Sequence, residues 1–93
     1  MINNGINFLD SFYKDIKKIK DQTIKKRLKN TIINLEETTG VAESKALLKI
    51  KGHPCAYRVK VGNYRLGCYL KSNTQLVVAR FIKRNDMYKV FPK

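Results

Sequence analysis

The stretch from Ala56 to Leu70, AYRVKVGNYRLGCYL, constrains the fold of this chain more than any other. Successive side chains of a β-strand point to opposite faces of a sheet, and both halves of this stretch alternate between apolar and polar residues in that way. Gly62 and Asn63, between the two halves, tolerate the positive φ angles of a tight turn. The pattern therefore predicts a β-hairpin made of two half-buried strands.

The two faces of this predicted hairpin differ in character. One face collects the apolar side chains Tyr57, Val59, Val61, Leu66, Cys68 and Leu70. The other face carries Arg58, Lys60 and Arg65, and we expect it to be exposed. Three cations on one face outline a binding site for an anion, although a solvated basic surface would show the same spacing.

Positive charge is concentrated in the second half of the chain. The 93 residues include 20 basic and 7 acidic side chains, which gives a net charge of +13. Residues 44–93 hold 12 of the basic side chains and only one acid, Asp86. Such a surface attracts polyanions, nucleic acids above all, in a salt-dependent way. No amphipathic helix with a broad exposed apolar face is evident, so we expect no membrane partner.

The N-terminal residues predict a short strand and then a helix. Ile2, Ile6 and Phe8 alternate as in a first strand, which we expect at a sheet edge or beside the later hairpin. Asp10 or Ser11 would then cap a helix of about three turns, in which apolar residues recur at helical spacing.

A second helix and a last strand complete the predicted fold. Asp21 would cap the second helix, which we expect to end by Gly40. Residues 74–82 read as a central strand that Arg80 interrupts, and residues 83–88 as a polar turn or short helix. The fold class is therefore α+β: an N-terminal strand and a helical hairpin packed on one face of a small, mainly antiparallel, twisted sheet. We expect one domain over residues 1–93.

The sequence holds few other chemical groups of note. Cys55 and Cys68 are far apart and the chain has a single histidine, so we predict free thiols in a reducing cytoplasm and no metal site. His53 lies in a loop between glycine and proline, where a structural or exposed histidine is commoner than a general base.

The hairpin and the C-terminal segment together resemble a known family. The hairpin reads Tyr57-Arg58-Val59-Lys60-Val61-Gly62-Asn63-Tyr64-Arg65-Leu66, and the segment after the last strand reads Lys83-Arg84-Asn85-Asp86-Met87-Tyr88. With the helical hairpin before them, they resemble the RelE/ParE superfamily of toxins from bacterial type II toxin–antitoxin systems. The resemblance implies a ribosome-dependent endoribonuclease that cuts mRNA, has no cofactor and is silenced by an antitoxin protein.

The resemblance also implies which residues act on the RNA. Arg58 and Lys60 match the two basic residues of the first hairpin strand, and Arg65 matches the arginine that follows the turn tyrosine. Arg84 and Tyr88 match the arginine and the tyrosine near the C-terminus of the family. These residues would surround the phosphate that is cut.

Two positions depart from the family pattern. Arg58 stands where RelE has lysine, and Lys83 stands where many relatives have a histidine, which removes one possible acid or base. We expect Lys83, with Arg58 and Lys60, to bind RNA phosphates.

The chemistry of such a site can be argued from the side chains. The 2′-hydroxyl of RNA can attack the neighbouring phosphate without a metal, because it is already tethered beside its target. Arginine grips phosphate in a bidentate way, so Arg65 and Arg84 would stabilise the extra negative charge. Tyr88 would act as a base or orient the nucleophile, and Lys60 or Arg58 would assist protonation of the leaving 5′-oxygen. Alternatively, Tyr88 would anchor the C-terminal tail on the sheet or stack on a base.

Other functions fit the same sequence. A ParE-like toxin would inhibit DNA gyrase on the same fold, a basic module would bind nucleic acid without cutting it, and a degenerate toxin would only bind its antitoxin. A domain of charge +13 also favours a partner with an acidic, disordered segment that folds over the basic face. We expect that antitoxin to contact the helical hairpin and the sheet near the site.

Overall fold

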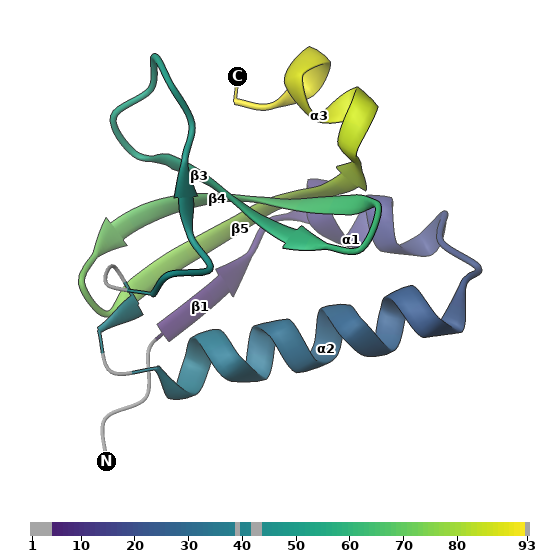
Figure 1. The fold of residues 1–93 in the computed structure, drawn as a ribbon, viewed down its shortest axis with the longest axis horizontal. Helices are drawn as coiled ribbons and strands as arrows, with labels where there is room; N and C mark the ends of the chain where they lie inside the picture. The colour runs from purple at the N-terminus through teal and green to yellow at the C-terminus, as the bar shows by residue number, and fades with distance from the viewer. Residues whose placement is uncertain (1–4, 39, 42–43, 93) are drawn as a thin grey trace.

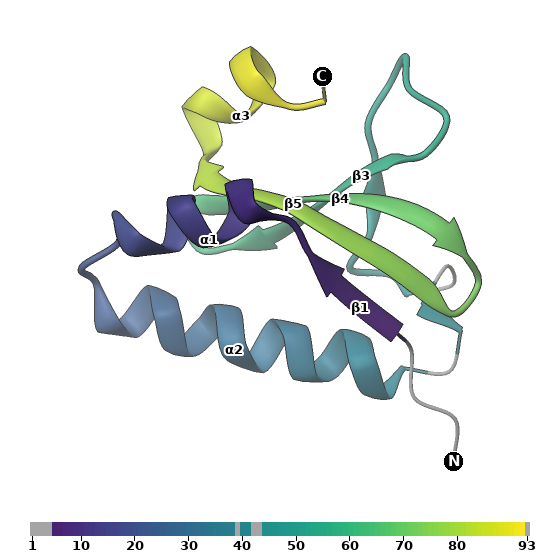
Figure 2. The same cartoon turned by 180° about the vertical axis from the view of Figure 1, so that it is seen from behind.

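The chain folds into a five-stranded β-sheet with helices on both sides of it (Figure 1; Figure 2). This computed structural model describes residues 5–38, 40–41 and 44–92. The elements are β1 (Gly5–Phe8), α1 (Asp10–Lys17), α2 (Gln22–Glu37), β2 (Leu48–Lys49), β3 (Ala56–Val61), β4 (Tyr64–Ser72), β5 (Gln75–Lys83) and α3 (Arg84–Val90). Across the sheet the strands follow the order β1-β5-β4-β3-β2. The predicted α+β class is confirmed.

The predicted hairpin is the β3–β4 pair. Its strands are antiparallel, with Lys60 opposite Arg65 and Val61 opposite Tyr64. At the turn, Gly62 has a φ of 60°. Among the described residues, only glycines have a positive φ. The turn therefore depends on the missing Cβ of Gly62, and Asn63 does not share this role.

The first strand lies at the edge of the sheet, one of the two places that the sequence predicted. β1 pairs in parallel with β5, from Gly5 beside Gln75 to Phe8 beside Val78, and makes the sheet mixed. Ile2, the first residue of the predicted strand, lies outside the described residues. The opposite edge is β2, two residues of the connector in which no strand was predicted, paired with Tyr57 and Arg58 of β3.

The long helix α2 covers the apolar face of the sheet. Asp21 caps it as predicted, because its carboxylate accepts hydrogen bonds from the amides of Thr23 at 2.9 Å and Ile24 at 3.3 Å. Leu28 and Leu35 of α2 are buried. They pack with the apolar residues of β3, β4 and β5 in one core, and each buried leucine contributes about 2 kcal/mol.

The first helix differs from its prediction in length and in its cap. α1 spans eight residues, about two turns, and not three. Leu9 is its N-cap residue and makes no side-chain capping bond, so the prediction of a cap by Asp10 or Ser11 is wrong. Ile19 lies beyond the end of the helix and is buried in the core all the same.

The side chains of α1 complete the open edge of β5. β1 pairs with β5 only as far as Val78, which leaves the next backbone groups of β5 without a strand partner. The hydroxyl of Ser11 donates to the carbonyl of Ala79 at 2.6 Å, and the amide of Phe81 donates to Asp15 Oδ2 at 2.9 Å. Two residues one helical turn apart thus take the place of a strand and give partners to the carbonyl of Ala79 and the amide of Phe81.

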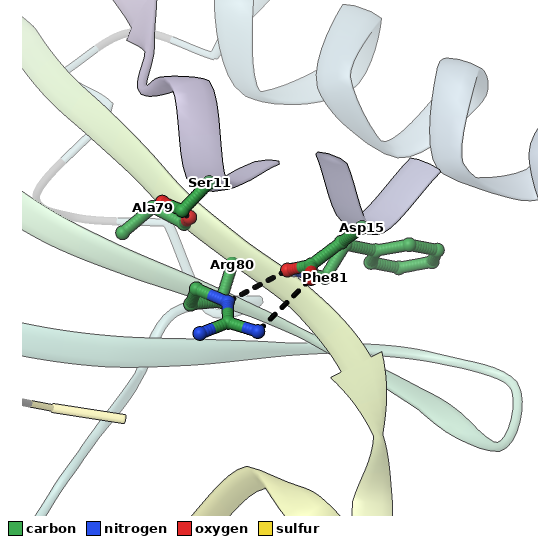
Figure 3. Close-up of polar contacts among 5 residues, drawn as sticks. All are labelled: Ser11, Asp15, Ala79, Arg80 and Phe81. Atoms are coloured by element: carbon green, nitrogen blue, oxygen red, sulfur yellow. Dashed lines mark hydrogen bonds and ion pairs between the residues drawn. The ribbon is translucent and has the colours of Figure 1, made fainter. Parts of the chain in front are cut away.

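Arg80 interrupts the apolar strand because it pairs with this same carboxylate. Arg80 Nε donates to Asp15 Oδ2 at 2.8 Å and Nη2 donates to Oδ1 at 2.9 Å (Figure 3). Asp15 is only 5% exposed, so its charge needs this bidentate partner. The hydrogen bond raises the pKa of Arg80, which therefore keeps its charge at all pH values of interest.

The short helix α3 lies on the other face of the sheet, opposite α2 (Figure 1; Figure 2). Met87 and Phe91 anchor it in a second apolar cluster with Ala56 and Ala79. Gly67 makes room for this packing, since a Cβ at this position would lie 2.9 Å from the ring of Phe91. The face that the sequence predicted as exposed is therefore partly covered.

Two further predictions concern the thiols and the membrane. Cys68 is buried and Cys55 exposed, and both are free thiols as predicted. Burial raises the pKa of the Cys68 thiol, which is thus neutral and unreactive. Among the described residues, no helix is long and apolar enough to cross a membrane.

Replacing Asp15 by alanine tests the link between α1 and β5. The change leaves the amide of Phe81 and the charge of Arg80 without their partner. We expect the free energy of unfolding to fall by about 3 kcal/mol, which lowers the melting temperature by roughly 15 °C. Thermal and urea denaturation measure both quantities. Asp10→Ala, in the exposed first turn of the same helix, is the control, and equal stability of the two variants would contradict this account.

Candidate functional site

Three cations of the β3–β4 hairpin share one face of the sheet, as the sequence predicted. Arg58 and Lys60 lie on β3, and Arg65 lies opposite Lys60 on β4. Their exposure differs from the prediction, because Arg65 is buried and only 8% exposed, whereas Lys60 is exposed. Arg58 is intermediate.

Hydrogen bonds to the turn hold Arg65 in place. Its Nη1 donates to the carbonyls of Gly62 at 3.0 Å and Tyr64 at 2.8 Å. These bonds satisfy one end of the guanidinium and leave its charge without a carboxylate partner among the described residues. A guanidinium fixed in this way can bind an anion without first losing side-chain entropy.

The helix α3 brings two further predicted residues to this face. The amide of Arg84 donates to the carbonyl of Asn63 at 2.9 Å, which ties the start of α3 to the hairpin turn. Tyr88 is 64% exposed, so it does not anchor the tail, and Met87 does so instead. The guanidinium carbon of Arg58 lies 5.9 Å from the ring centre of Tyr88, within the range of a cation–π contact.

These five side chains line one hollow, which we call the basic hollow. It has a volume of about 220 Å³ and is lined by Arg58, Lys60, Arg65, Arg84 and Tyr88. No carboxylate lines it. Four cations held near one another without an anion repel one another, so a bound anion would relieve that repulsion. The chemistry of the hollow therefore suits a phosphate group beside a phenol.

Lys83 is the one predicted site residue that does not line the basic hollow. It is the N-cap residue of α3. Together with Tyr64 it lines two other hollows. Lys83 is also the last residue of β5, so the direction of its side chain depends on how the chain turns from the strand into α3. The spacing of residues in the sequence did not reveal that turn.

His53 also lies away from the basic hollow. Its Nδ1 accepts a hydrogen bond from the amide of Cys55 at 3.3 Å, and its ring centre lies 5.7 Å from that of Tyr69. This is the structural use of histidine that the loop position favoured.

Sequence reasoning missed the residues that support the site. Asp15 was one acid among the lysines of a helix, and its pairing with Arg80 spans 65 positions. The only signal was a single arginine inside an apolar strand. Gly67 and Phe91 gave a weaker signal, since a glycine in a strand often marks a close approach of another group.

Comparisons with known proteins identify the family of this chain. Residues 6–88 match the family model described as the ParE toxin of the type II toxin–antitoxin system parDE. The chain therefore belongs to this family of type II toxins, and the resemblance to the RelE/ParE superfamily is confirmed. It is also 34% identical over 86 residues to Toxin RelE3 of Methanocaldococcus jannaschii, an alignment that covers 91% of this chain and 96% of that protein.

Solved structures show the same fold. The antitoxin–toxin complex RelB–RelE from Methanococcus jannaschii contains a chain with a TM-score of 0.74 and 31% identity, over 92% of this chain and 99% of that one. A variant of the Escherichia coli toxin RelE in the free state gives a TM-score of 0.70 at 20% identity, over 94% and 90% of the two chains. The protein is thus a RelE-like toxin of a type II toxin–antitoxin system.

The packing of Phe91 on Gly67 should control how α3 completes the basic hollow. Phe91→Ala removes the largest anchor of α3, a change that costs about 3 kcal/mol in buried sites. We expect the exchange rate of the α3 amides with solvent to rise by about tenfold or more, because the helix separates from the sheet more often. Amide exchange measured by NMR reports this, with β4 as internal reference and Lys89→Ala as control. Unchanged exchange in α3 would show that Phe91 is not its anchor.

Proposed function

We propose that this toxin is a ribosome-dependent endoribonuclease that cuts mRNA without a metal ion. The observation that carries the proposal is the basic hollow, in which residues from β3, β4 and α3 converge on a space of about 220 Å³. RNA supplies its own nucleophile, the 2′-hydroxyl, so a protein needs only to orient it, move two protons and stabilise charge on the phosphate. Cations and a phenol in one hollow suit these tasks.

The reaction would proceed by displacement at phosphorus. The 2′-oxygen forms a bond to phosphorus and loses its proton to a base, and the bond from phosphorus to the 5′-oxygen breaks. The leaving 5′-oxygen takes up a proton. The products are a 2′,3′-cyclic phosphate and a free 5′-hydroxyl, with no water consumed in this step.

The two arginines of the hollow would hold the phosphate. Arg65 is fixed by the turn carbonyls, and Arg84 is held through its backbone bond to Asn63. The backbone of Arg84 and the guanidinium of Arg65 are thus tied to the same turn. A preorganised cation such as Arg65 stabilises a charged transition state without having to reorient, and the exposed side chain of Arg84 would close on the phosphate from α3.

Tyr88 and Lys60 would manage the protons. Tyr88 is exposed at the rim of the hollow, and the guanidinium carbon of Arg58 lies 5.9 Å from its ring centre, so the two side chains can reach the same phosphate. Tyr88 would take the proton from the 2′-hydroxyl or orient it. Lys60 would protonate the 5′-oxygen, because lysine releases a proton far more readily than the guanidinium of Arg58 does.

A cognate antitoxin would be the protein partner. The RelB–RelE structure of Methanococcus jannaschii is a complex of toxin and antitoxin, which supports such a pair here. The net charge of +13 favours an acidic segment. An apolar groove of about 400 Å³ between α1 and α2, with Tyr13 and Ile33 exposed at it, would accept apolar side chains of that segment. The cytoplasm, where ribosomes translate mRNA, would be the site of action.

Removal of both arginines from the hollow should abolish toxicity and cleavage. We expect Arg65→Ala,Arg84→Ala to lose both the growth arrest and the new 5′ ends inside translated frames, because the phosphate loses the two arginines that would hold it. Induced expression and mapping of mRNA 5′ ends measure this. Arg84→Ala alone serves as a second variant, since Arg84 is exposed and its removal does not disturb the hairpin.

The control for this experiment is Lys26→Ala,Lys71→Ala, which removes the same charge from exposed positions outside the hollow. Growth arrest by the wild type without mRNA cuts, accompanied by a DNA-damage response, would contradict the nuclease and support gyrase inhibition. Wild-type expression without arrest would support a binding module or a degenerate toxin.

Loss of the phenolic hydroxyl should separate binding from cleavage. Tyr88→Phe keeps the ring and its contact with Arg58 but removes the group that handles the proton. We expect a cleavage rate lower by about 10²–10⁴-fold and an unchanged affinity for uncleavable RNA. Single-turnover cleavage on programmed ribosomes gives the rate. A variant as fast as the wild type would remove Tyr88 from the mechanism.

A further inference from the structure

Two more hollows continue from the basic hollow around the start of α3. The first, the turn hollow, has a volume of about 580 Å³ and is lined by Asn63, Tyr64, Lys83 and Arg84 among others. It shares Arg84 with the basic hollow. The basic hollow is therefore not isolated, because the side chain at one end of it also borders the next depression.

The second of these hollows lies between α1, β5 and α3, and we call it the α1–α3 hollow. It has a volume of about 510 Å³ and shares Tyr64 and Lys83 with the turn hollow. Lys18, the C-cap residue of α1, and Arg80 from β5 also line it. Shared residues thus connect the three hollows. Arg84 lies where the basic hollow meets the turn hollow, and Lys83 lies where the turn hollow meets the α1–α3 hollow.

Two of the three acids that line these hollows, Asp15 and Asp21, hold the fold together. Asp15 is bonded to Arg80 and to the amide of Phe81, and Asp21 caps α2. Asp86 lies 4.0 Å from Lys89 in an exposed pair, which contributes little.

The side chains of two cations in the connected hollows, unlike those of Asp15 and Asp21, have no ionic or capping role in the described part of the fold. Lys18 and Lys83 are exposed and make no ion pair in the part of the chain that the structure describes. Arg80 is held rigidly by Asp15 through Nε and Nη2, and Figure 3 shows its third nitrogen turned away from the carboxylate. The connected hollows therefore combine two exposed ammonium groups with one guanidinium held by a carboxylate.

We propose that the α1–α3 hollow is a second phosphate site, in which Lys18 and Lys83 bind the backbone of the RNA strand that is cut. This rests on the proposed function. A single strand carries one negative charge per nucleotide, so it matches a series of hollows with cations along them better than a compact anion does. Such contacts position the strand without reading its sequence, because they touch only the backbone. The site would hold the phosphates that flank the one in the basic hollow.

The test is a binding measurement on RNA that cannot be cut. The probe is a fluorescent single strand of about 12 nucleotides with 2′-O-methyl groups on every sugar, and a strand of about 3 nucleotides is the short comparison. Lys18→Gln,Lys83→Gln is compared with Lys26→Gln,Lys71→Gln, which removes the same charge from exposed positions that line none of the three hollows. Anisotropy is followed over a range of salt concentrations, and melting curves verify that all variants fold.

We expect Lys18→Gln,Lys83→Gln to bind the long strand roughly tenfold more weakly than the wild type. The plot of log affinity against log salt should become less steep by about 1.4, which is about 0.7 for each lost phosphate contact. Binding of the short strand should not change. The control variant should keep the wild-type slope.

If the affinities of the two double variants for the long strand depend equally steeply on salt, the inference is wrong. Because the probe cannot be cut, the result is independent of catalysis. A wild type that cuts no mRNA but shows the expected difference would reject the nuclease and leave the second phosphate site standing.

Discussion

The contact between the Asp15 carboxylate and β5 is the interaction on which the rest of the structure depends. The strand β1 is too short to cover the whole edge of β5, and unpaired backbone groups at a buried edge are costly. Ser11 and Asp15 fill the gap, and the same carboxylate neutralises Arg80. One helical turn thus closes the sheet, fixes α1 against it and allows an arginine inside an apolar strand.

One face of the sheet carries the larger apolar core, and the other carries the basic hollow. Below the sheet, α2 and the apolar residues of β3–β5 form the larger core, with Leu28 and Leu35 buried. Above it, the smaller cluster around Met87 and Phe91 does little more than hold α3 in position. A small anchor suffices there because α3 is also tied to the turn through the amide of Arg84. The basic hollow therefore forms where the smaller apolar cluster lies next to the turn of the hairpin.

The charges of the site are tolerated for a physical reason. Arg65 is buried without a carboxylate, and the carbonyls of Gly62 and Tyr64 replace part of the water that it loses. Asp15 and Asp21 are bound in the α1–β5 contact and in the cap of α2, and Asp86 lies 4.0 Å from Lys89 and does not line the basic hollow. The site remains positive because the fold uses the first two carboxylates for structure, and this leaves room for an anionic ligand.

The sequence by itself determined the main helices and strands and the alternation of the hairpin, although it revealed neither β2 nor the length and cap of α1. Strict alternation from Ala56 to Leu70 puts Arg58, Lys60 and Arg65 on one face whatever the tertiary structure, because side-chain direction in a strand is a local property. The α2 cap by Asp21 followed from the same kind of local rule. The resemblance to the RelE/ParE superfamily rested on these residues and on the segment after β5.

Tertiary structure alone decided the rest. It buried Arg65, turned Lys83 away from the basic hollow, paired β1 in parallel with β5 and joined Asp15 to Arg80. These outcomes depend on contacts between residues far apart in the chain and on how the ends of strands and helices meet. Local spacing determines which way a side chain points from its own element, and only packing determines what it then meets.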